Sequence, residues 1–423
     1  MSGVPIEAKS KASSSLMAQV LERNNLMVAL KQVQRNKGAP GIDGMTVEEL
    51  PDYLKAYWPR IKSKLLAGTY RPKPVRRVEI PKPDGRKRQL GIPTVVDRLI
   101  QQAIAQVLQG EWDEQFHEHS YGFRPKRSAH QAIRHAQTTM RSGRDWLVDC
   151  DLAAFFDRVN HDVLMHRLKK QTTDGDVLRL INRYLKAGVR IDGKTIRSVE
   201  GVPQGGPLSP ILSNIVLNDL DWELERRGHH FVRYADDFVV FLRSEEAGKR
   251  VLVSLQRYLR DSLRLKVNTD KSAVGRPWER TFLGVTFSRR DYRIKVSEKS
   301  LKNLKAKIRR LSRRTRGHSV KQIIAELRKT LLGWKAYFDI SEVLSPLRDL
   351  DKWIRRKLRC YVLKQWGRSG YRQMRRRGVD RRLAWNTAKS AKGPWRLSAS
   401  PALYRALPTR YFRGLGLPEL VTR

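Results

Sequence analysis

The sequence predicts a mixed α+β fold in which strands and helices alternate through the middle of the chain and helices follow toward the C-terminus. Three observations predict it. Short β-rich runs occupy residues 146–152 and 231–242, residues 93–116 carry apolar side chains at helical spacing, and only helical patterns follow residue 298. No repeat at a fixed period is visible, which disfavours solenoids and propellers. A chain of 423 residues should form two to four domains.

The composition is strongly basic. Lys and Arg number 86 against 42 Asp and Glu, which leaves a formal charge of +44. Because self-repulsion at this charge opposes compaction, we expect a polyanionic partner, and nucleic acid is the first candidate. An anionic membrane is the rival, but no apolar run approaches the roughly 20 residues of a spanning helix.

Two further features bear on the cellular compartment. The N-terminal segment lacks an apolar stretch bounded by a cleavage-like site, so we expect no secretory signal and a cytoplasmic protein. The two cysteines, Cys150 and Cys360, are too few and too far apart for a disulfide framework or a zinc ligand set. We expect both to be small core residues.

The N-terminal third predicts helices and one basic hairpin. A helix is expected over residues 16–33, followed by turn residues at 36–44. Residues 76–90 read as two strands joined by PKPDG, with Asp84-Gly85 as the turn signal. A helix over residues 93–116 follows the hairpin.

The C-terminal third predicts a small basic three-helix domain. Apolar positions from Leu301 to Leu311 form a narrow stripe, a second helix spans residues 320–338, and a third follows from Leu347. The first helix carries cations expected to bind RNA: Lys302, Lys305, Arg309, Arg310, Arg313 and Arg314. The tail from residue 367 mixes Arg with aromatic side chains, which suits RNA but also describes a solvated face.

The candidate chemistry lies in aspartates from distant segments. In FVRYADDFVVFL, Asp236 and Asp237 stand at the tip of a hairpin between apolar arms, and Asp151 closes the apolar run at 146–152. Three carboxylates in such an arrangement suit two divalent metal ions about 4 Å apart, and Mg²⁺ prefers oxygen ligands. Strand alternation puts Asp149 on the same face as Asp151, so periodicity alone does not choose between them. An Asp pair at a turn is also common for structural reasons.

A loop rich in glycine and proline precedes a predicted helix within residues 201–221. The glycines would permit close backbone approach to a base pair or sugar. The alternative is an ordinary loop and helix start.

The order of these motifs resembles the reverse transcriptases encoded by group II introns, the intron maturases. The segments RRVEIPKPDGRKRQLGIPTVVDRLIQQAI, HSYGFRPKRSAHQAI, DLAAFFDRVNH, GVPQGGPLSPILSN, YADD, LKVNTDKS and FLGVTF carry the likeness. NKGAPGIDGMTVEEL resembles the N-terminal extension of the family and GWKAYF the start of its maturase region. The resemblance implies a right-hand polymerase with fingers, palm, helical thumb and a basic C-terminal tail.

The resemblance also implies residue roles that spacing leaves open. Asp151, Asp236 and Asp237 match the catalytic aspartates that hold two Mg²⁺ ions. The implied nucleotide-binding residues are Lys82, Arg88, Phe156, Gln204 and Lys271, of which Phe156 would exclude a ribonucleotide 2′-hydroxyl. The implied primer grip is Phe282, Leu283 and Gly284. Arg124 could contact template or triphosphate.

The implied activity is RNA-directed DNA synthesis together with binding of intron RNA as a maturase, with dNTPs and target DNA as further partners and no membrane. Intron mobility by target-primed reverse transcription (retrohoming) and association with the bacterial nucleoid follow from the same likeness. No CxxC or matching His cluster is present near the C-terminus, so we expect no DNA endonuclease module. The alternatives are a splicing-only maturase and a reverse transcriptase of phage defence or CRISPR adaptation.

The expected domain limits follow the same likeness. They are an N-terminal extension (1–72), fingers and palm (73–298), a helical thumb or maturase domain (299–366) and a basic nucleic-acid-binding region (367–423).

Overall fold

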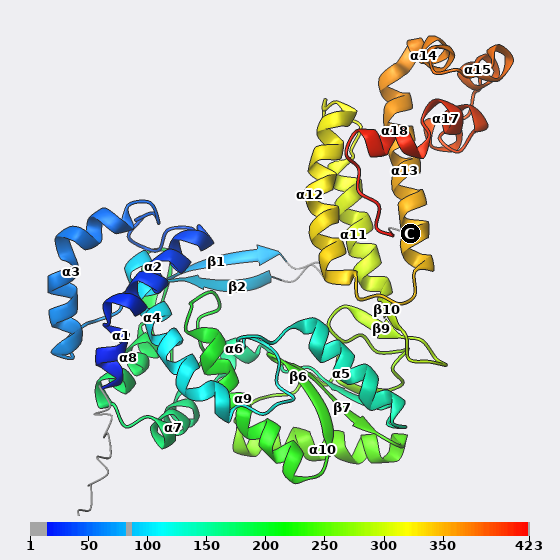
Figure 1. Ribbon diagram of the computed structural model, residues 1–423. Helices are drawn as coiled ribbons and strands as arrows, with labels where there is room; N and C mark the ends of the chain where they lie inside the picture. Colours follow the sequence, from blue (N-terminus) through cyan, green and yellow to red (C-terminus); the bar gives the residue numbers. More distant parts are fainter. Residues whose placement is uncertain (1–14, 82–86, 422–423) are drawn as a thin grey trace, which may run out of the picture. The chain divides into compact units, whose positions relative to one another are not determined.

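The computed structural model describes residues 15–81 and 87–421, which form two compact units divided between Arg276 and Pro277 (Figure 1). The helices of the first unit are α1 (Leu16–Val20), α2 (Arg23–Asn36), α3 (Leu50–Leu66), α4 (Val95–Trp112), η1 (Asp113–Gln115), α5 (Ala129–Arg141), α6 (Phe155–Arg158), α7 (His161–Gln171), α8 (Gly175–Lys186), α9 (Ser209–Arg226) and α10 (Glu245–Ser262). Its strands are β1 (Val75–Pro81), β2 (Lys87–Ile92), β3 (Trp146–Cys150), β4 (Val189–Ile191), β5 (Lys194–Ile196), β6 (His230–Tyr234), β7 (Asp237–Leu242) and β8 (Ala273–Gly275).

Two four-stranded sheets organise the first unit. The basic hairpin β1–β2 is antiparallel, as predicted, and extends through β4 and β5 in the order β2-β1-β4-β5. The second sheet has the order β6-β7-β3-β8 with antiparallel pairing throughout. Helix α5 packs against β6, and α10 packs against β3 and β8. Residues predicted as strands at 146–152 and 231–242 therefore form the second sheet.

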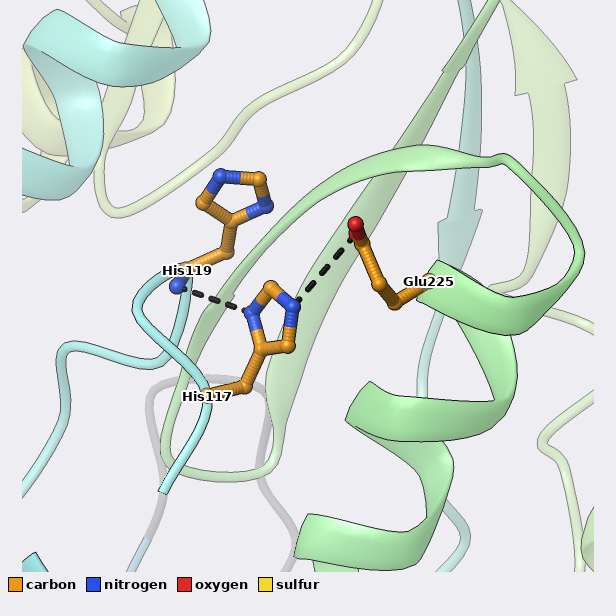
Figure 2. A group of neighbouring side chains, drawn as sticks. All are labelled: His117, His119 and Glu225. Carbon is orange, nitrogen blue, oxygen red and sulfur yellow. Dashed lines mark hydrogen bonds and ion pairs between the residues drawn. The ribbon is translucent and has the colours of Figure 1, made fainter. Parts of the chain in front are cut away.

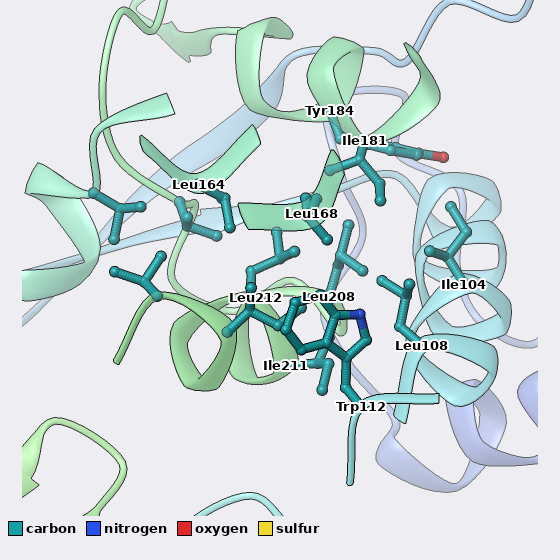
Figure 3. Close-up of a cluster of buried hydrophobic side chains, with 14 of the residues drawn as sticks. Ile104, Leu108, Trp112, Leu164, Leu168, Ile181, Tyr184, Leu208, Ile211 and Leu212 are labelled. Carbon is teal, nitrogen blue, oxygen red and sulfur yellow. The ribbon is translucent and has the colours of Figure 1, made fainter. Parts of the chain in front are cut away.

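A core of aliphatic side chains holds α4, α7, α8 and α9 together (Figure 3). Leu108 of α4, Leu168 of α7 and Ile181 of α8 are fully buried, and Leu212 of α9 is 1% exposed. Removing such surfaces from water supplies the main favourable contribution to folding. This core supports the end of α9 that begins beside the loop at residues 201–208.

The helix predicted over residues 16–33 is interrupted. It forms α1 and α2, which are separated at Leu21 and Glu22. The side-chain amide of Asn25 donates to the Val20 carbonyl at 3.1 Å and to the Ala103 carbonyl at 3.1 Å. The Val20 carbonyl, left free at the end of α1, thus accepts a side-chain hydrogen bond from Asn25, and helical periodicity gives no sign of it.

The second unit is mainly helical. It contains β9 (Val285–Phe287), β10 (Ile294–Val296), α11 (Glu298–Leu311), α12 (Val320–Phe338), α13 (Ser345–Trp366), η2 (Gly367–Ser369), α14 (Gly370–Arg376), α15 (Arg381–Ala388), α16 (Pro394–Leu397), α17 (Pro401–Ala406) and α18 (Thr409–Gly414). Helices α11, α12 and α13 confirm the predicted three-helix region. The tail beyond it forms short helices, two of which, α15 and α17, begin with a capping side chain, Asp380 and Ser400.

Two smaller expectations have clear outcomes. Cys150 and Cys360 are free and buried, as predicted for core residues. In the described ranges, no helix is long and apolar enough to cross a membrane.

Candidate active site

The predicted aspartates lie at one end of the central sheet. Strand β3 pairs with β7 in a register that matches Cys150 with Phe238. Asp151 follows Cys150 and Asp237 precedes Phe238, so the antiparallel register places these two aspartates on adjacent strands at the same end of the sheet. Tyr234 pairs with Asp237 across the two-residue turn that contains Asp236. The structure therefore brings Asp151, Asp236 and Asp237 together.

The electrostatics of this cluster suit a cation. Desolvation, followed by the negative charges of Asp149, Asp236 and Asp151, raises the pKa of Asp237 to about 7. Burial likewise raises the pKa of Asp236, assisted by Asp151 and opposed by Arg88. A set of mutually repelling carboxylate oxygens suits a hard divalent ion such as Mg²⁺, whose positive charge would offset the repulsion.

The backbone amide and carbonyl of Asp151 hold the segment 266–272 in place. The Asp151 amide donates to Ser272 Oγ at 2.9 Å, and the Asn268 amide donates to the Asp151 carbonyl at 2.8 Å. These bonds place Lys271 Nζ 3.3 Å from Asp151 Oδ2. A lysine 120 positions away in sequence thus sits beside a candidate metal ligand.

A cleft of about 600 Å³ lies next to Asp236. Arg88, Phe156 and Gln204 line it, so three of the five predicted nucleotide-binding residues share one cavity with a candidate metal ligand. Arg88 Nε donates to Gln204 Oε1 at 2.7 Å, which links the β1–β2 hairpin to the loop before α9. Lys82, the fifth predicted residue, lies outside the described residues.

Gly201, in the loop before α9, lies close to the backbone of the chain itself. Its φ is +89°, and a Cβ at this position would lie 2.8 Å from the Asp157 carbonyl oxygen. The glycine therefore permits close approach to the chain's own backbone, next to Phe156, where the sequence suggested an approach to a base or sugar.

Sequence reasoning missed other residues of the cleft and left one role open. Asn36 and Gly38 line the cleft together with Arg98 of α4. These positions lie within segments that carry the family likeness, but sequence reasoning assigned them no role, because their place in the cleft depends on how the chain after α2 folds back. The guanidinium of Arg124 is 5% exposed and donates to Asp113, His117 and Ser120, so its hydrogen bonds hold the loop before α5.

In the second unit, Phe282 is 2% exposed, while Leu283 and Gly284 form a turn with φ of +48° and +80°. The Gly284 carbonyl accepts the Ser297 amide at 3.1 Å and the Ser300 hydroxyl at 2.9 Å. The Tyr337 hydroxyl donates to the Leu283 carbonyl at 3.0 Å.

The predicted RNA-binding cations of the second unit differ in their surroundings. Lys302, Arg309 and Arg310 are exposed on α11. The guanidinium carbon of Arg309 lies 5.4 Å and Lys305 Nζ lies 5.8 Å from the centre of the Trp353 ring. Arg313 and Arg314, predicted on the same helix, are exposed beyond its end, because Ser312 caps α11.

Figure 2 shows a further group of titratable side chains. The ligand atoms of His117, His119 and Glu225 lie within 4.8 Å of one another. His117 Nδ1 accepts the backbone N–H of His119 at 3.0 Å, and its Nε2 is 3.5 Å from Glu225 Oε2. A neutral imidazole has one N–H and one lone pair. Since Nδ1 accepts, Nε2 carries the proton toward Glu225, which favours a hydrogen-bonded chain over a metal centre.

Comparison with known proteins agrees with the fold. The sequence matches the family described as "Reverse transcriptase (RNA-dependent DNA polymerase)" over residues 80–287. It also matches "Group II intron, maturase-specific domain" over residues 301–379. The first match defines the class: the chain is an RNA-directed DNA polymerase with the reverse transcriptase fold, which confirms the predicted fold class.

The relatives narrow the class. "Protein YkfC" of Escherichia coli (strain K12) is 35% identical over 281 residues, covering 56% of this chain and 73% of YkfC. "Group II intron-encoded protein LtrA" of Lactococcus lactis subsp. cremoris is 36% identical over 195 residues, 46% of this chain and 32% of LtrA. "Putative COX1/OXI3 intron 1 protein" of Saccharomyces cerevisiae is 33% identical over 212 residues, 48% of this chain and 25% of that protein. The chain belongs to the group II intron reverse transcriptase and maturase family, whose maturase domain implies binding of intron RNA.

Proposed function

We infer that this chain copies RNA into DNA with two Mg²⁺ ions held by Asp151, Asp236 and Asp237. The observation that carries the proposal is the convergence of these carboxylates beside a cleft of nucleotide size. Carboxylate oxygens are the ligands that Mg²⁺ prefers. The chemistry supplied by such a pair of ions is activation of a primer hydroxyl and stabilisation of the leaving pyrophosphate.

The residues of the cleft divide the remaining work. The half-buried ring of Phe156 closes the side of the cleft where a 2′-hydroxyl would lie, and so selects deoxyribonucleotides. Gln204, fixed by its bond from Arg88, packs near the incoming nucleotide. Arg88 and Lys82 contact its triphosphate. Lys271, already beside Asp151, neutralises charge on the departing phosphates.

The second unit binds the nucleic acids. The turn at Leu283 and Gly284 grips the primer end, and the exposed cations of α11 bind intron RNA through phosphates and shape. The basic region from residue 367 contacts target DNA or RNA. Together these activities support splicing of the intron and its mobility by target-primed reverse transcription. The corresponding domains are the N-terminal extension (1–72), the fingers and palm (73–298), the thumb or maturase domain (299–366) and the basic C-terminal region (367–423).

The test is extension of a DNA primer annealed to an RNA template by the purified chain, with dNTPs and Mg²⁺. We expect full-length DNA, loss of synthesis with EDTA, and loss of synthesis in Asp151→Asn. Tight binding of intron RNA without any synthesis under Mg²⁺ or Mn²⁺ would instead identify a splicing-only maturase.

A further inference from the structure

The Arg233 side chain is fully buried at the end of β6, two residues before Ala235. Its Nε and Nη2 donate to the two carboxylate oxygens of Asp221 at 2.7 and 2.5 Å. Its Nη1 donates to Asn214 Oδ1 at 3.0 Å and to the Ala235 carbonyl at 2.9 Å. Asp221 and Asn214 both lie on α9 and are 0% exposed. One guanidinium therefore joins α9 to the turn that carries Asp236 and Asp237.

The turn needs such support, because its backbone is unusual and closely packed. Ala235 has φ of +60°, a region that a residue with a Cβ seldom adopts unless its surroundings hold it there. A Cβ on Gly122 would lie 2.2 Å from the Ala235 nitrogen, so the backbone of Gly122 abuts the turn. Asn214 Nδ2 donates to the Gly122 carbonyl at 2.9 Å, which ties this neighbour to the same network.

The backbone of Arg233 is held as firmly as its side chain. Its amide donates to the His119 carbonyl at 3.0 Å, and its carbonyl accepts the Tyr121 amide at 2.9 Å. The strand residue and its guanidinium are thus fixed from opposite sides, by the loop before α5 and by α9. These hydrogen bonds restrict movement of the Ala235 carbonyl relative to α9.

We propose that Arg233 is a positioning residue for the aspartate turn: by holding the Ala235 carbonyl against α9, it sets the direction in which Asp236 and Asp237 present their carboxylates to metal ions. The proposal rests on the assignment of these aspartates as metal ligands under the proposed function. Lysine cannot replace the arginine, because one ammonium does not reproduce four hydrogen bonds of a planar fork. The buried Asp221 would also lose its bidentate partner.

The experiment compares Arg233→Lys with wild type in the full chain, using Mn²⁺ as the probe in isothermal titration and single-nucleotide incorporation as the second readout. Because small displacements of reacting groups cost large factors in rate, we expect kcat to fall about 10- to 100-fold while KM for the nucleotide changes less than about threefold. The Mn²⁺ concentration at half-saturation should rise about fivefold or more. A circular dichroism spectrum and a thermal unfolding transition like those of wild type show that the variant is folded.

The matched control is Arg167→Lys. Arg167 Nε donates to Asp219 Oδ2 at 2.7 Å, so it too pairs with an aspartate of α9, but its other bond goes to Val163 of its own helix α7. This substitution should change neither Mn²⁺ affinity nor kcat. An equal loss in Arg167→Lys would overturn the positioning role, and so would a folded Arg233→Lys that binds Mn²⁺ as wild type does.

Asn214→Ala keeps the proposal testable when Arg233→Lys fails to fold. It removes one acceptor of Arg233 and the bond to Gly122 without leaving a charge unpaired. We expect the Mn²⁺ concentration at half-saturation to rise about two- to fivefold, and an unchanged value would overturn the proposal. Asp236→Asn separates the two levels of inference. If Asp236→Asn binds Mn²⁺ as wild type does, the assignment of these aspartates as metal ligands is wrong. If Asp236→Asn loses Mn²⁺ binding while the folded Arg233→Lys variant keeps it, only the positioning role of Arg233 is rejected.

Discussion

The aspartate turn in the first unit and helix α11 in the second carry their charges in opposite ways. At the turn, desolvation and the repulsion of nearby carboxylates at fixed positions raise the pKa of Asp237 to about 7. On α11, the cations are exposed and spread along a surface, and Lys302 has only a 3.8 Å ion pair with Glu298. A charge at the turn is therefore irreplaceable, whereas a charge on α11 is one of many that meet phosphates.

The largest expected effect is loss of DNA synthesis in Asp236→Asn. Because one charge disappears from the metal site, we expect synthesis to fall by at least about 100-fold. RNA affinity should stay within a few fold, since a large basic surface is untouched. Primer extension on RNA and filter binding of the same RNA measure the two properties. Undiminished synthesis would remove this aspartate from the mechanism.

Neutralising cations of α11 should weaken RNA binding and leave DNA synthesis largely intact, the reverse of the effect of Asp236→Asn. In the triple variant Lys302→Gln, Arg309→Gln and Arg310→Gln, RNA affinity at fixed salt should fall about 10- to 100-fold and the slope of log affinity against log salt should flatten by about two to three. Splicing assisted by the protein should fall in parallel, while synthesis on a short primer and template is largely retained.

The control for α11 neutralises three exposed cations that are already paired with a neighbouring acid in the first unit: Arg226, Lys249 and Arg260. We expect little change in RNA affinity from this control variant. Loss of splicing in Asp236→Asn but not in the α11 variant would contradict the contrast between the two regions.

Phe156→Ala should change selectivity more than rate. The cavity left in the cleft beside Gln204 removes the clash with a 2′-hydroxyl, so discrimination against ribonucleotides should drop about tenfold or more. Competing incorporation of a matched ribonucleotide and deoxyribonucleotide measures it. A variant that rejects ribonucleotides as well as wild type does would place the selective contact elsewhere.

The smallest effect concerns pH. Since the pKa of Asp237 is raised to about 7, protons compete with the metal ion below that pH. Mn²⁺ affinity should weaken by up to about tenfold per unit as pH falls from 7 to 6, and metal binding near pH 7 should release protons. Titration calorimetry in two buffers of different ionisation enthalpy measures this release. Affinity that is independent of pH between 6 and 8 would show that Asp237 is ionised throughout.

The same shift affects folding in the absence of metal. A carboxyl group whose pKa is higher in the folded than in the unfolded chain binds more protons when folded, so its contribution to stability declines as pH rises from about 4 to about 7. The metal-free protein should gain thermal stability from Asp237→Asn above pH 7, and added Mn²⁺ should stabilise wild type but not this variant. Equal stabilisation of both by Mn²⁺ would contradict the assignment.

Local pattern in the sequence was sufficient for much of the fold. Short β-rich runs predicted the strand that ends before Asp151 and the strand that begins at Asp237. Helical spacing predicted α4 and the three helices of the second unit, and an apolar stretch after the glycine-rich loop predicted α9. The motif order predicted the family, because many independent segments occur in one arrangement. The roles given to the individual site residues remain predictions of that likeness, although the structure gathers Arg88, Phe156 and Gln204 around one cleft.

By itself, the sequence determined which segments are strands or helices and which carboxylates are candidates, because these depend on residues a few positions apart. Only the tertiary structure decided that Lys271 lies beside Asp151, that α1 ends where Asn25 takes the Val20 carbonyl, and that the guanidinium of Arg233 reaches the Ala235 carbonyl. The first contact joins residues 120 positions apart, and the other two join near neighbours whose side chains are directed by what packs around them, Ala103 of α4 for Asn25 and Asp221 of α9 for Arg233. A buried arginine and an exposed one look alike in a sequence, since burial is a property of what the rest of the chain places around the side chain.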